Sequence, residues 1–342
     1  MSFFGKSSLS IPQLTATNNL LTADSIPRVS VWVGATSGIG LATLQAFTSR
    51  GQPFKAYVVG RNEARQKPAL DALRASNDKA EIVFIEGQVS LLRDVQRICD
   101  DITAGEDSID ALFLSQGYLP FNGRVETEEG LERCLAVTYY SKIAFAKLLM
   151  PLLRQAAHPR ILAIVAAGQE VADIPLDDID FEKPGRFGPM TIAKQGSTMI
   201  TLALDRIARD EPRVVVIHAH PGSVATGVLS RGEGGGLKHH LLRWIVEPIV
   251  SLGSFTPAQS GERSLYLLTS STFGGSGTPL PEGRERGVNV DGDVDGGAVF
   301  LADMQMNTVR QEKVLAELRE RKADQVVWEH TIDVLKKYLP GI

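Results

Sequence analysis

Cysteine is scarce in this 342-residue chain, and its two residues, Cys99 and Cys134, cannot form the several bridges of a disulfide framework. Long apolar runs are also missing. No stretch approaches the ~20 residues that cross a bilayer, and residues 1–6 lack the apolar core of a signal peptide. These absences exclude a disulfide-stapled secreted scaffold and predict a cytoplasmic protein without stable membrane insertion.

Basic charge is not in excess either. The formal net charge is −4 and the isoelectric point is about 5.9, so the basic surface of a nucleic-acid-binding protein is not expected. Hydrophobic residues make up 43% of the chain and charged residues 22%. This balance predicts one large folded α/β domain with a substantial core.

A glycine-rich turn follows the first predicted strand, residues 31–33, and a helical pattern starts directly after it. Glycines let the backbone approach a pyrophosphate closely, and the pyrophosphate charge then lies against the free N–H groups at the start of the helix. The order of strand, glycine turn and helix therefore predicts a dinucleotide site. The turn residues expected to bind the cofactor are Gly34, Thr36, Ser37, Gly38, Ile39 and Gly40.

The spacing of the three glycines resembles the T-G-x-x-x-G-x-G turn of the short-chain dehydrogenase/reductase superfamily, with Val33 in the threonine position. Four further matches follow in the family order, and the resemblance covers residues 29–271. It implies an α/β fold with a Rossmann-type doubly wound parallel sheet. It also implies cofactor contacts after the later strands, from Arg61, Asn62, Gln88, Val89, Gly117, Lys194, Pro221, Gly222, Val224 and Thr226.

The residue after the second predicted strand, residues 55–59, favours NADP(H) as the cofactor. Arg61 follows Gly60 there, and a guanidinium can reach a 2′-phosphate, whereas an acidic residue would bind the ribose of NAD. Gln88 follows the predicted strand 82–85, where the family usually has an aspartate that holds the adenine amino group. Its side chain can accept the same hydrogen bond without the charge.

The catalytic side chains of the family are mostly replaced in this chain. The family uses an asparagine on the central helix, a serine at the end of the fifth strand, and a Tyr-x-x-x-Lys pair on the next helix. The resemblance places Thr138 at the asparagine and Ala166, or Ala167 in a register shifted by one, at the serine. Met190 stands at the tyrosine, four residues before the retained Lys194.

Tyrosine is absent between Tyr140 and Tyr266, so no shifted alignment restores the phenol. A positioned general acid is worth a factor of about 100 to 10,000, and a methionine thioether cannot donate a proton. Three functions remain open. The first is hydride transfer with Lys194, Thr138, Ser115 or a substrate hydroxyl as the acid. The second is non-redox cyclisation, isomerisation or elimination in a shaped pocket, and the third is silent binding.

The chain divides into a polar N-terminal extension at residues 1–28, the Rossmann domain at 29–271, and a loop with a two-helix C-terminal cap at 272–342. The cap either covers the domain or pairs subunits in a homodimer. Three glycines form a hinge before an amphipathic segment, and residues 230–252 are predicted to be a mobile lid over a small apolar organic substrate. A helix packed on the core or at a dimer interface, and a segment that contacts a membrane surface, are the alternatives to a lid.

Two further segments of the sequence carry predictions, one about the central helix and one about the branch of the superfamily. Residues 131–150 predict a long central helix, and the connection between Ala167 and Lys194 is longer than in minimal family members. Such an insertion resembles the retinol-dehydrogenase-like branch of the superfamily. The glycine turn and the long C-terminal cap look like a divergent fungal group associated with small-molecule biosynthesis.

No metal is expected in this chain. Residues 291–296 begin like an EF-hand loop, but Ala302 stands at the twelfth position, where a bidentate glutamate is needed. The pairs His218/His220 and His239/His240 have no further ligands at metal-binding spacing. His220 precedes the predicted nicotinamide loop, and we keep it as a weaker candidate near the cofactor.

Overall fold

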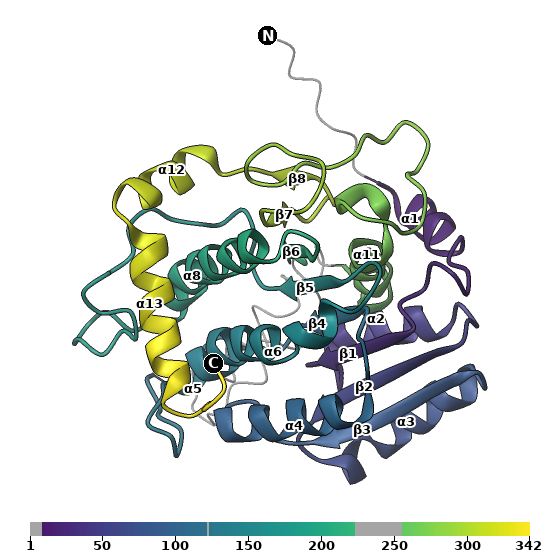
Figure 1. The fold of residues 1–342 in the computed structure, drawn as a ribbon, viewed down its shortest axis with the longest axis horizontal. Helices are drawn as coiled ribbons and strands as arrows, with labels where there is room; N and C mark the ends of the chain where they lie inside the picture. Colours follow the sequence, from purple (N-terminus) through teal and green to yellow (C-terminus); the bar gives the residue numbers. More distant parts are fainter. Residues whose placement is uncertain (1–8, 122, 223–254) are drawn as a thin grey trace, which may run out of the picture.

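A twisted sheet with helices on both faces forms the centre of the protein (Figure 1). The structure, a computed structural model, describes residues 9–121, 123–222 and 255–342. Its strands are β1 (Val29–Val33), β2 (Phe54–Gly60), β3 (Ala80–Glu86), β4 (Ala111–Leu114), β5 (Arg160–Ile164), β6 (Val215–Ala219), β7 (Phe300–Ala302) and β8 (Thr308–Val309). Their order is β3-β2-β1-β4-β5-β6-β7-β8, and every pairing except β7 with β8 is parallel. This order confirms the predicted Rossmann-type fold.

Helices cover the sheet in two layers (Figure 1). One layer holds α4 (Leu92–Gly105), α5 (Arg133–Leu135), the π-helical segment η1 (Ala136–Tyr140), α6 (Ser141–Leu148), α7 (Met150–Leu153), α8 (Pro189–Asp210), α12 (Glu312–Glu320) and α13 (Ala323–Lys336). The other holds α1 (Ile11–Asn18), α2 (Gly38–Thr48), α3 (Glu63–Ser76), α11 (Pro257–Thr269) and the short 3₁₀ turn η4 (Ser271–Phe273).

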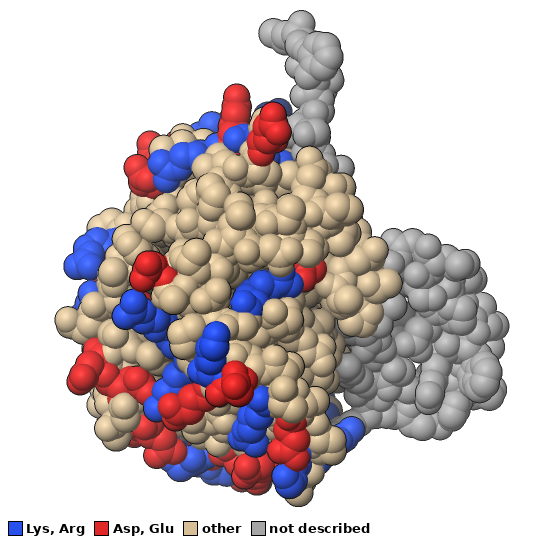
Figure 2. All heavy atoms as spheres, turned by 90° about the vertical axis from the view of Figure 1, so that its right-hand side faces the viewer, with Lys and Arg blue, Asp and Glu red and all other residues tan. Residues whose placement is uncertain are grey.

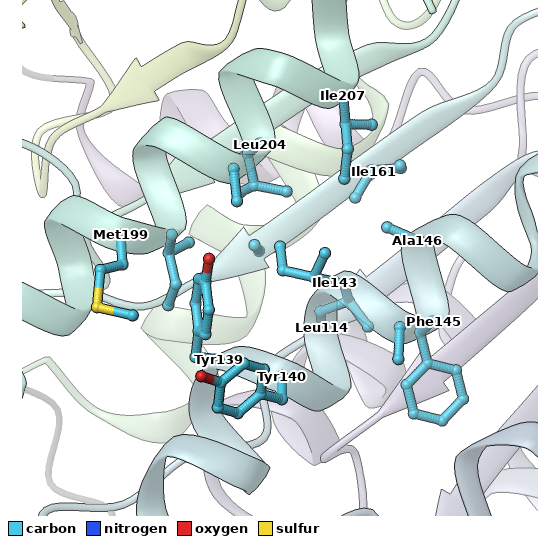
Figure 3. Packing of buried hydrophobic residues seen from close by; sticks show 14 of the residues in the cluster. Leu114, Tyr139, Tyr140, Ile143, Phe145, Ala146, Ile161, Met199, Leu204 and Ile207 are labelled. Carbon is cyan, nitrogen blue, oxygen red and sulfur yellow. The ribbon is translucent and has the colours of Figure 1, made fainter. Parts of the chain in front are cut away.

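Successive side chains of a strand point to opposite faces of the sheet, and this alternation explains the two buried layers. In β1, Val31 and Val33 join the cluster beneath α4, α6 and α8, whereas Trp32 joins the cluster beneath α2 and α11. Figure 3 shows Ile143 of α6 lying between the sheet and α8. A parallel strand buried on both faces is apolar at nearly every position, which is why residues 31–33 show no polar alternation.

Two predicted boundaries differ from the structure. Residues 9–28 are not a polar extension, because Leu14, Leu21 and Ile26 are buried in the same cluster as Trp32. The side chain of Asn18 also donates to the backbone carbonyl of Glu262 on α11, at 2.9 Å. The sheet likewise continues past residue 271 into β7 and β8. The apolar run 299–302 was the signal for this strand.

The central helix also differs from the regular helix predicted for residues 131–150. It begins at Arg133, and residues 136–140 form one π-helical turn in which the N–H of Ser141 bonds to the carbonyl of Ala136. A π-turn holds one more residue than an α-turn, and such turns frequently mark functional sites. Hydrophobic periodicity alone does not distinguish it. The C-terminal cap, by contrast, contains the two predicted helices, and α13 lies along α8 (Figure 1).

Charged side chains of both signs lie next to one another on the face shown in Figure 2, mostly in its lower half. Many ion pairs of the described residues are local contacts such as Lys67–Asp71 on α3, with nitrogen and oxygen 2.8 Å apart. That face offers no broad field of basic charge.

The contact between α11 and α2 gives a test of the fold. A Cβ atom at Gly261 would lie 2.4 Å from the carbonyl oxygen of Ala42, so Gly261→Ala must push two helices apart. We expect it to lower the free energy of unfolding by about 1–3 kcal/mol. The matched control is Gly196→Ala in α8, where the nearest atom would be 3.9 Å away. The control should raise stability by roughly 1 kcal/mol, since alanine favours the helix. Equal effects in urea unfolding would contradict the close packing.

Candidate functional site

The glycine turn between β1 and α2 has no room for side chains. Gly34 and Gly38 have φ angles of 85° and 59°, in the left-handed region that favours glycine. A Cβ atom at Gly34 would lie 2.4 Å from the backbone nitrogen of Gln116, and one at Gly40 would lie 2.5 Å from the carbonyl oxygen of Gly34. The side chain of Ser37, the N-cap residue, makes no capping hydrogen bond to the start of α2. The first N–H groups of α2 therefore suit an anion, and a dinucleotide pyrophosphate fits this cradle.

The other predicted cofactor residues of this half lie along the same edge of the sheet. Thr36 packs under the end of β2, because a Cβ atom at Gly60 would lie 2.5 Å from its methyl carbon. Arg61 follows directly and is exposed. The side-chain oxygen of Asn62 accepts the N–H of Arg65 at 2.8 Å and caps α3, so it serves the helix.

Further residues at this edge are accessible. Ser37 and Gln88 are exposed, Ile39 and Val89 are half-buried, and Gly117 is exposed. The backbone N–H of Gln88 donates to the carboxylate of Asp94 at 2.7 Å, which fixes the loop and leaves the side-chain amide at the surface. These positions agree with an adenosine binding along the carboxyl ends of β1, β2 and β3.

The residues that the resemblance places at the catalytic positions follow β4 and β5 or lie on the helices beside them. The hydroxyl of Thr138, in η1, would lie 3.3 Å from a Cβ atom at Gly117, so it faces the loop after β4. Ser115 instead donates to the carbonyl of Val33 at 3.4 Å, so its hydroxyl faces the glycine turn. Lys194 is exposed on α8. Of the predicted replacement acids, Thr138 and Lys194 remain available.

Met190 occupies the first turn of α8, four residues before Lys194 and on the same helical face. Its side chain is 65% exposed, so the described residues do not enclose it in an apolar pocket. A helical side chain covers the turn that precedes it, and a residue in the first turn has none to cover. The predicted lid at 230–252, together with Val224 and Thr226, lies outside the described residues.

The backbone N–H and the carbonyl of Ala166 each form a hydrogen bond with a buried side chain. Its N–H donates to Nε2 of His218 at 3.3 Å, and its carbonyl accepts the hydroxyl of Ser197 at 2.9 Å. Both partners are completely buried. Sequence reasoning missed Ser197, and it treated His218 only as a metal ligand. The signal was a polar residue inside the apolar run of β6.

The protonation of His218 follows from these contacts. Burial lowers the pKa of His218 to about 3, so the imidazole is neutral. Because Nε2 accepts a hydrogen bond, we assign the proton to Nδ1, which then donates to the hydroxyl of Thr201 at 2.8 Å. That hydroxyl donates in turn to Glu170, also at 2.8 Å. Burial raises the pKa of Glu170. This network fixes the end of β5 and holds Ala166 in place.

Lys142 is a second buried group that sequence reasoning missed. It lies one turn after Thr138, is completely buried, and donates to the carbonyl of Gln116. Burial lowers the pKa of Lys142 to about 7, so the neutral amine is readily populated. The sequence feature that could have identified it is a lysine among the apolar residues of the central helix.

The loop after β6 is tightly turned. Gly222 has a φ angle of 74°, and its N–H donates to Nδ1 of His220 at 2.9 Å. A Cβ atom at Gly222 would lie 2.8 Å from the ring of Phe255. Pro221 and Gly222 are therefore placed at the carboxyl end of β6, next to the catalytic positions on β5.

Metal ligands do not gather anywhere in residues 9–121, 123–222 and 255–342. Cys99 and Cys134 are buried and unbridged. The hydroxyl of Thr138 lies 3.7 Å from the sulfur of Cys134. Across the part of the chain that the structure describes, no helix is both long and apolar enough to span a membrane.

Comparisons with known proteins agree with this geometry. A model of the short chain dehydrogenase family matches residues 28–173. The chain is 32% identical over 330 residues to Oxidoreductase AN1596 of Emericella nidulans, which covers 94% of this chain and 97% of that protein. It is 26% identical over 258 residues to human Retinol dehydrogenase 14, covering 69% of this chain and 72% of that one.

A solved structure shows the same fold. The NADPH-bound carbonyl reductase from chicken fatty liver superposes with a TM-score of 0.52 at 14% identity, over 82% of this chain and 98% of that one. The fungal relative matches over nearly the whole chain, and the parallel sheet with its glycine turn has the arrangement of the family fold. The chain belongs to the short-chain dehydrogenase/reductase superfamily and is an oxidoreductase of that family.

Proposed function

We propose that this protein is a cytoplasmic NADP(H)-dependent oxidoreductase of small-molecule, secondary-metabolite biosynthesis, and that it acts on a small apolar substrate with a non-standard proton donor. The glycine cradle at the start of α2, in which a Cβ atom at Gly34 would lie 2.4 Å from the backbone nitrogen of Gln116 after β4, carries the proposal of cofactor binding. The exposed Arg61 after β2 supports the choice of NADP(H).

In the proposed reaction, separate residues bind the cofactor and donate the proton. Bound cofactor supplies or accepts a hydride. Arg61 binds the 2′-phosphate, the first turn of α2 binds the pyrophosphate, and Lys194 holds the nicotinamide ribose. The proton comes from Lys194, Thr138 or a substrate hydroxyl, because Ser115 faces the glycine turn and Met190 has no proton to donate.

Non-redox chemistry is the second candidate function. The replacement of both hydroxyl-bearing positions, by Met190 and Ala166, favours it, because a cyclisation or isomerisation needs orientation in a shaped pocket more than proton donation. Incubation with candidate polyketide or terpenoid ketones separates the two functions. Oxidation of NADPH with product supports hydride transfer, whereas product formed equally well with NADP⁺ supports the non-redox reaction. Cofactor binding without either leaves a silent binding protein.

Arg61→Ala tests the cofactor assignment. We expect it to weaken NADPH binding by about 10-fold or more while NADH binding changes little, because only NADPH presents a 2′-phosphate to the guanidinium. Fluorescence titration of both nucleotides measures this. Arg65→Ala, one helical turn further along α3 and exposed, is the matched control. Equal affinity of the native protein for NADPH and NADH would refute the assignment.

A further inference from the structure

Arg263, on α11, is a buried cation with two guanidinium nitrogens that lack hydrogen-bond partners among the described residues. Its exposed fraction is 6%, and its Nε and Nη2 atoms have no hydrogen-bond partner among the described residues. None of the described ion pairs includes it within 4 Å. The guanidinium stacks on the ring of Phe255, whose centre lies 4.0 Å from the guanidinium carbon. Burial lowers the pKa of Arg263, which shows how unfavourable this environment is for a charge.

Nearby groups do not satisfy this guanidinium. Asp303 attracts it from a distance, but one oxygen of the Asp303 carboxylate already accepts the backbone N–H groups of Gln305 and Asn307, at 2.8 and 2.9 Å. Phe255 offers only a ring face. A buried charge without a partner costs several kcal/mol, so a residue that performs only a structural role is rarely left in this state.

Arg160 provides the contrast within the same protein. It is also almost completely buried, but it donates to four backbone carbonyls, those of Leu267, Ser270, Gly274 and Ser276. The chain thus satisfies a buried guanidinium where the role is structural. At Arg263, two donors have no partner among the described residues and are left for another group.

The position of Arg263 indicates what that group is. Phe255, which stacks on Arg263, also packs on Gly222 in the turn after β6. His220 adds a donor at the same turn: its Nδ1 accepts the N–H of Gly222, so the neutral imidazole carries its proton on Nε2. This turn follows the carboxyl end of β6, the edge of the sheet at which the family binds its ligands.

We propose that Arg263 binds an anionic oxygen group, a phosphate or a carboxylate, beside the turn at residues 220–222. A planar guanidinium with two unpaired N–H directions matches the two oxygens of such a group. The inference rests on the proposed function, because the anion is either the pyrophosphate of the bound dinucleotide or a carboxylate carried by the apolar substrate. Asp303 limits the charge of the site and so favours a ligand that presents one anionic group.

Arg263→Met tests the proposal, with Arg213→Met as the matched control at the opposite end of β6, where Arg213 makes one 3.5 Å contact with a carbonyl. Dissociation constants for NADPH, inorganic pyrophosphate and decanoate are measured at a temperature where all variants are folded. We expect Arg263→Met to weaken at least one of them by roughly 10-fold or more, and the control to change none. Loss for NADPH and pyrophosphate identifies the cofactor; loss for decanoate alone identifies a substrate carboxylate.

The melting temperature of the Arg263→Met variant is a second measurement that tests the proposal. Because an unpaired buried charge destabilises the ligand-free protein, Arg263→Met should melt at or above the temperature of the native protein. Affinities that all change less than 10-fold, or a native protein that binds neither pyrophosphate, decanoate nor NADPH, overturn the anion site. If the native protein binds pyrophosphate or decanoate but not NADPH, the proposed function is wrong. The titrations with pyrophosphate and decanoate then still test the role of Arg263.

Discussion

Replacement of Arg160 by methionine is expected to lower the free energy of unfolding by about 3–5 kcal/mol, the largest effect on stability that we predict for a single substitution here. The guanidinium lies at the start of β5 and bonds to the carbonyls of Leu267, Ser270, Gly274 and Ser276, at 2.9–3.4 Å. Burial lowers the pKa of Arg160 to about 10, and this cost is offset by the four carbonyls. Methionine leaves them buried and unpaired, at about 1–3 kcal/mol each before relaxation.

Urea unfolding followed by circular dichroism measures the loss. Arg154→Met is the control, because Arg154 forms an ion pair with Glu211 at the surface, its side chain is 56% exposed, and such pairs contribute only about 0–1 kcal/mol. A loss below 1 kcal/mol for Arg160→Met would show that the segment after α11 reorganises freely and that β5 does not depend on it.

The second large effect concerns activity. Met190→Tyr combined with Ala166→Ser is expected to raise NADPH-dependent ketone reduction by about 100-fold or more over the native protein, because the pair restores both a proton donor and a second hydrogen bond to the substrate oxygen. Neither substitution alone should achieve this. The helix already presents position 190 four residues before Lys194, and Ala166 is fixed by His218 and Ser197.

The assay follows NADPH absorbance with small aliphatic and aromatic ketones. Adding Lys194→Met to the double variant should return the rate to the native level, since the lysine lowers the pKa of the introduced phenol and holds the ribose. Full activity from Met190→Tyr alone would show that Ala166 is not at the position of the family serine. No gain from the pair would show that the site is built for another reaction.

The parts of this protein that the sequence predicts well are those fixed by local chemistry. The three glycines and the apolar run before them determine strand, turn and helix together, and Gly34 and Gly38 indeed have positive φ angles. The short strand β7 escaped prediction because only Phe300, Leu301 and Ala302 form it, and its pairing with β6 is a contact made across 80 residues of chain.

The site was less accessible to prediction, for a different reason. Sequence position predicts that Ala166 and Met190 replace catalytic residues of the family, but burial decides what surrounds them. Nothing in the sequence distinguishes the unpaired Arg263 from the fully bonded Arg160, since the carbonyls that bond Arg160 lie more than 100 residues away in the chain. Likewise, the exposure of Met190 depends on its place in the first turn of α8, which helical periodicity does not define.

The π-helical turn at residues 136–140 sets the length of the chain as well as its shape. Removing one residue from it would restore an ordinary α-helix and rotate everything before the deletion by about 100° relative to α6. Thr138 would then turn away from Gly117, although every remaining amino acid would be unchanged. Substitutions in this turn are therefore easier to tolerate than deletions. In any larger set of related sequences, we expect the number of residues between Arg133 and Ser141 to vary less than their identities.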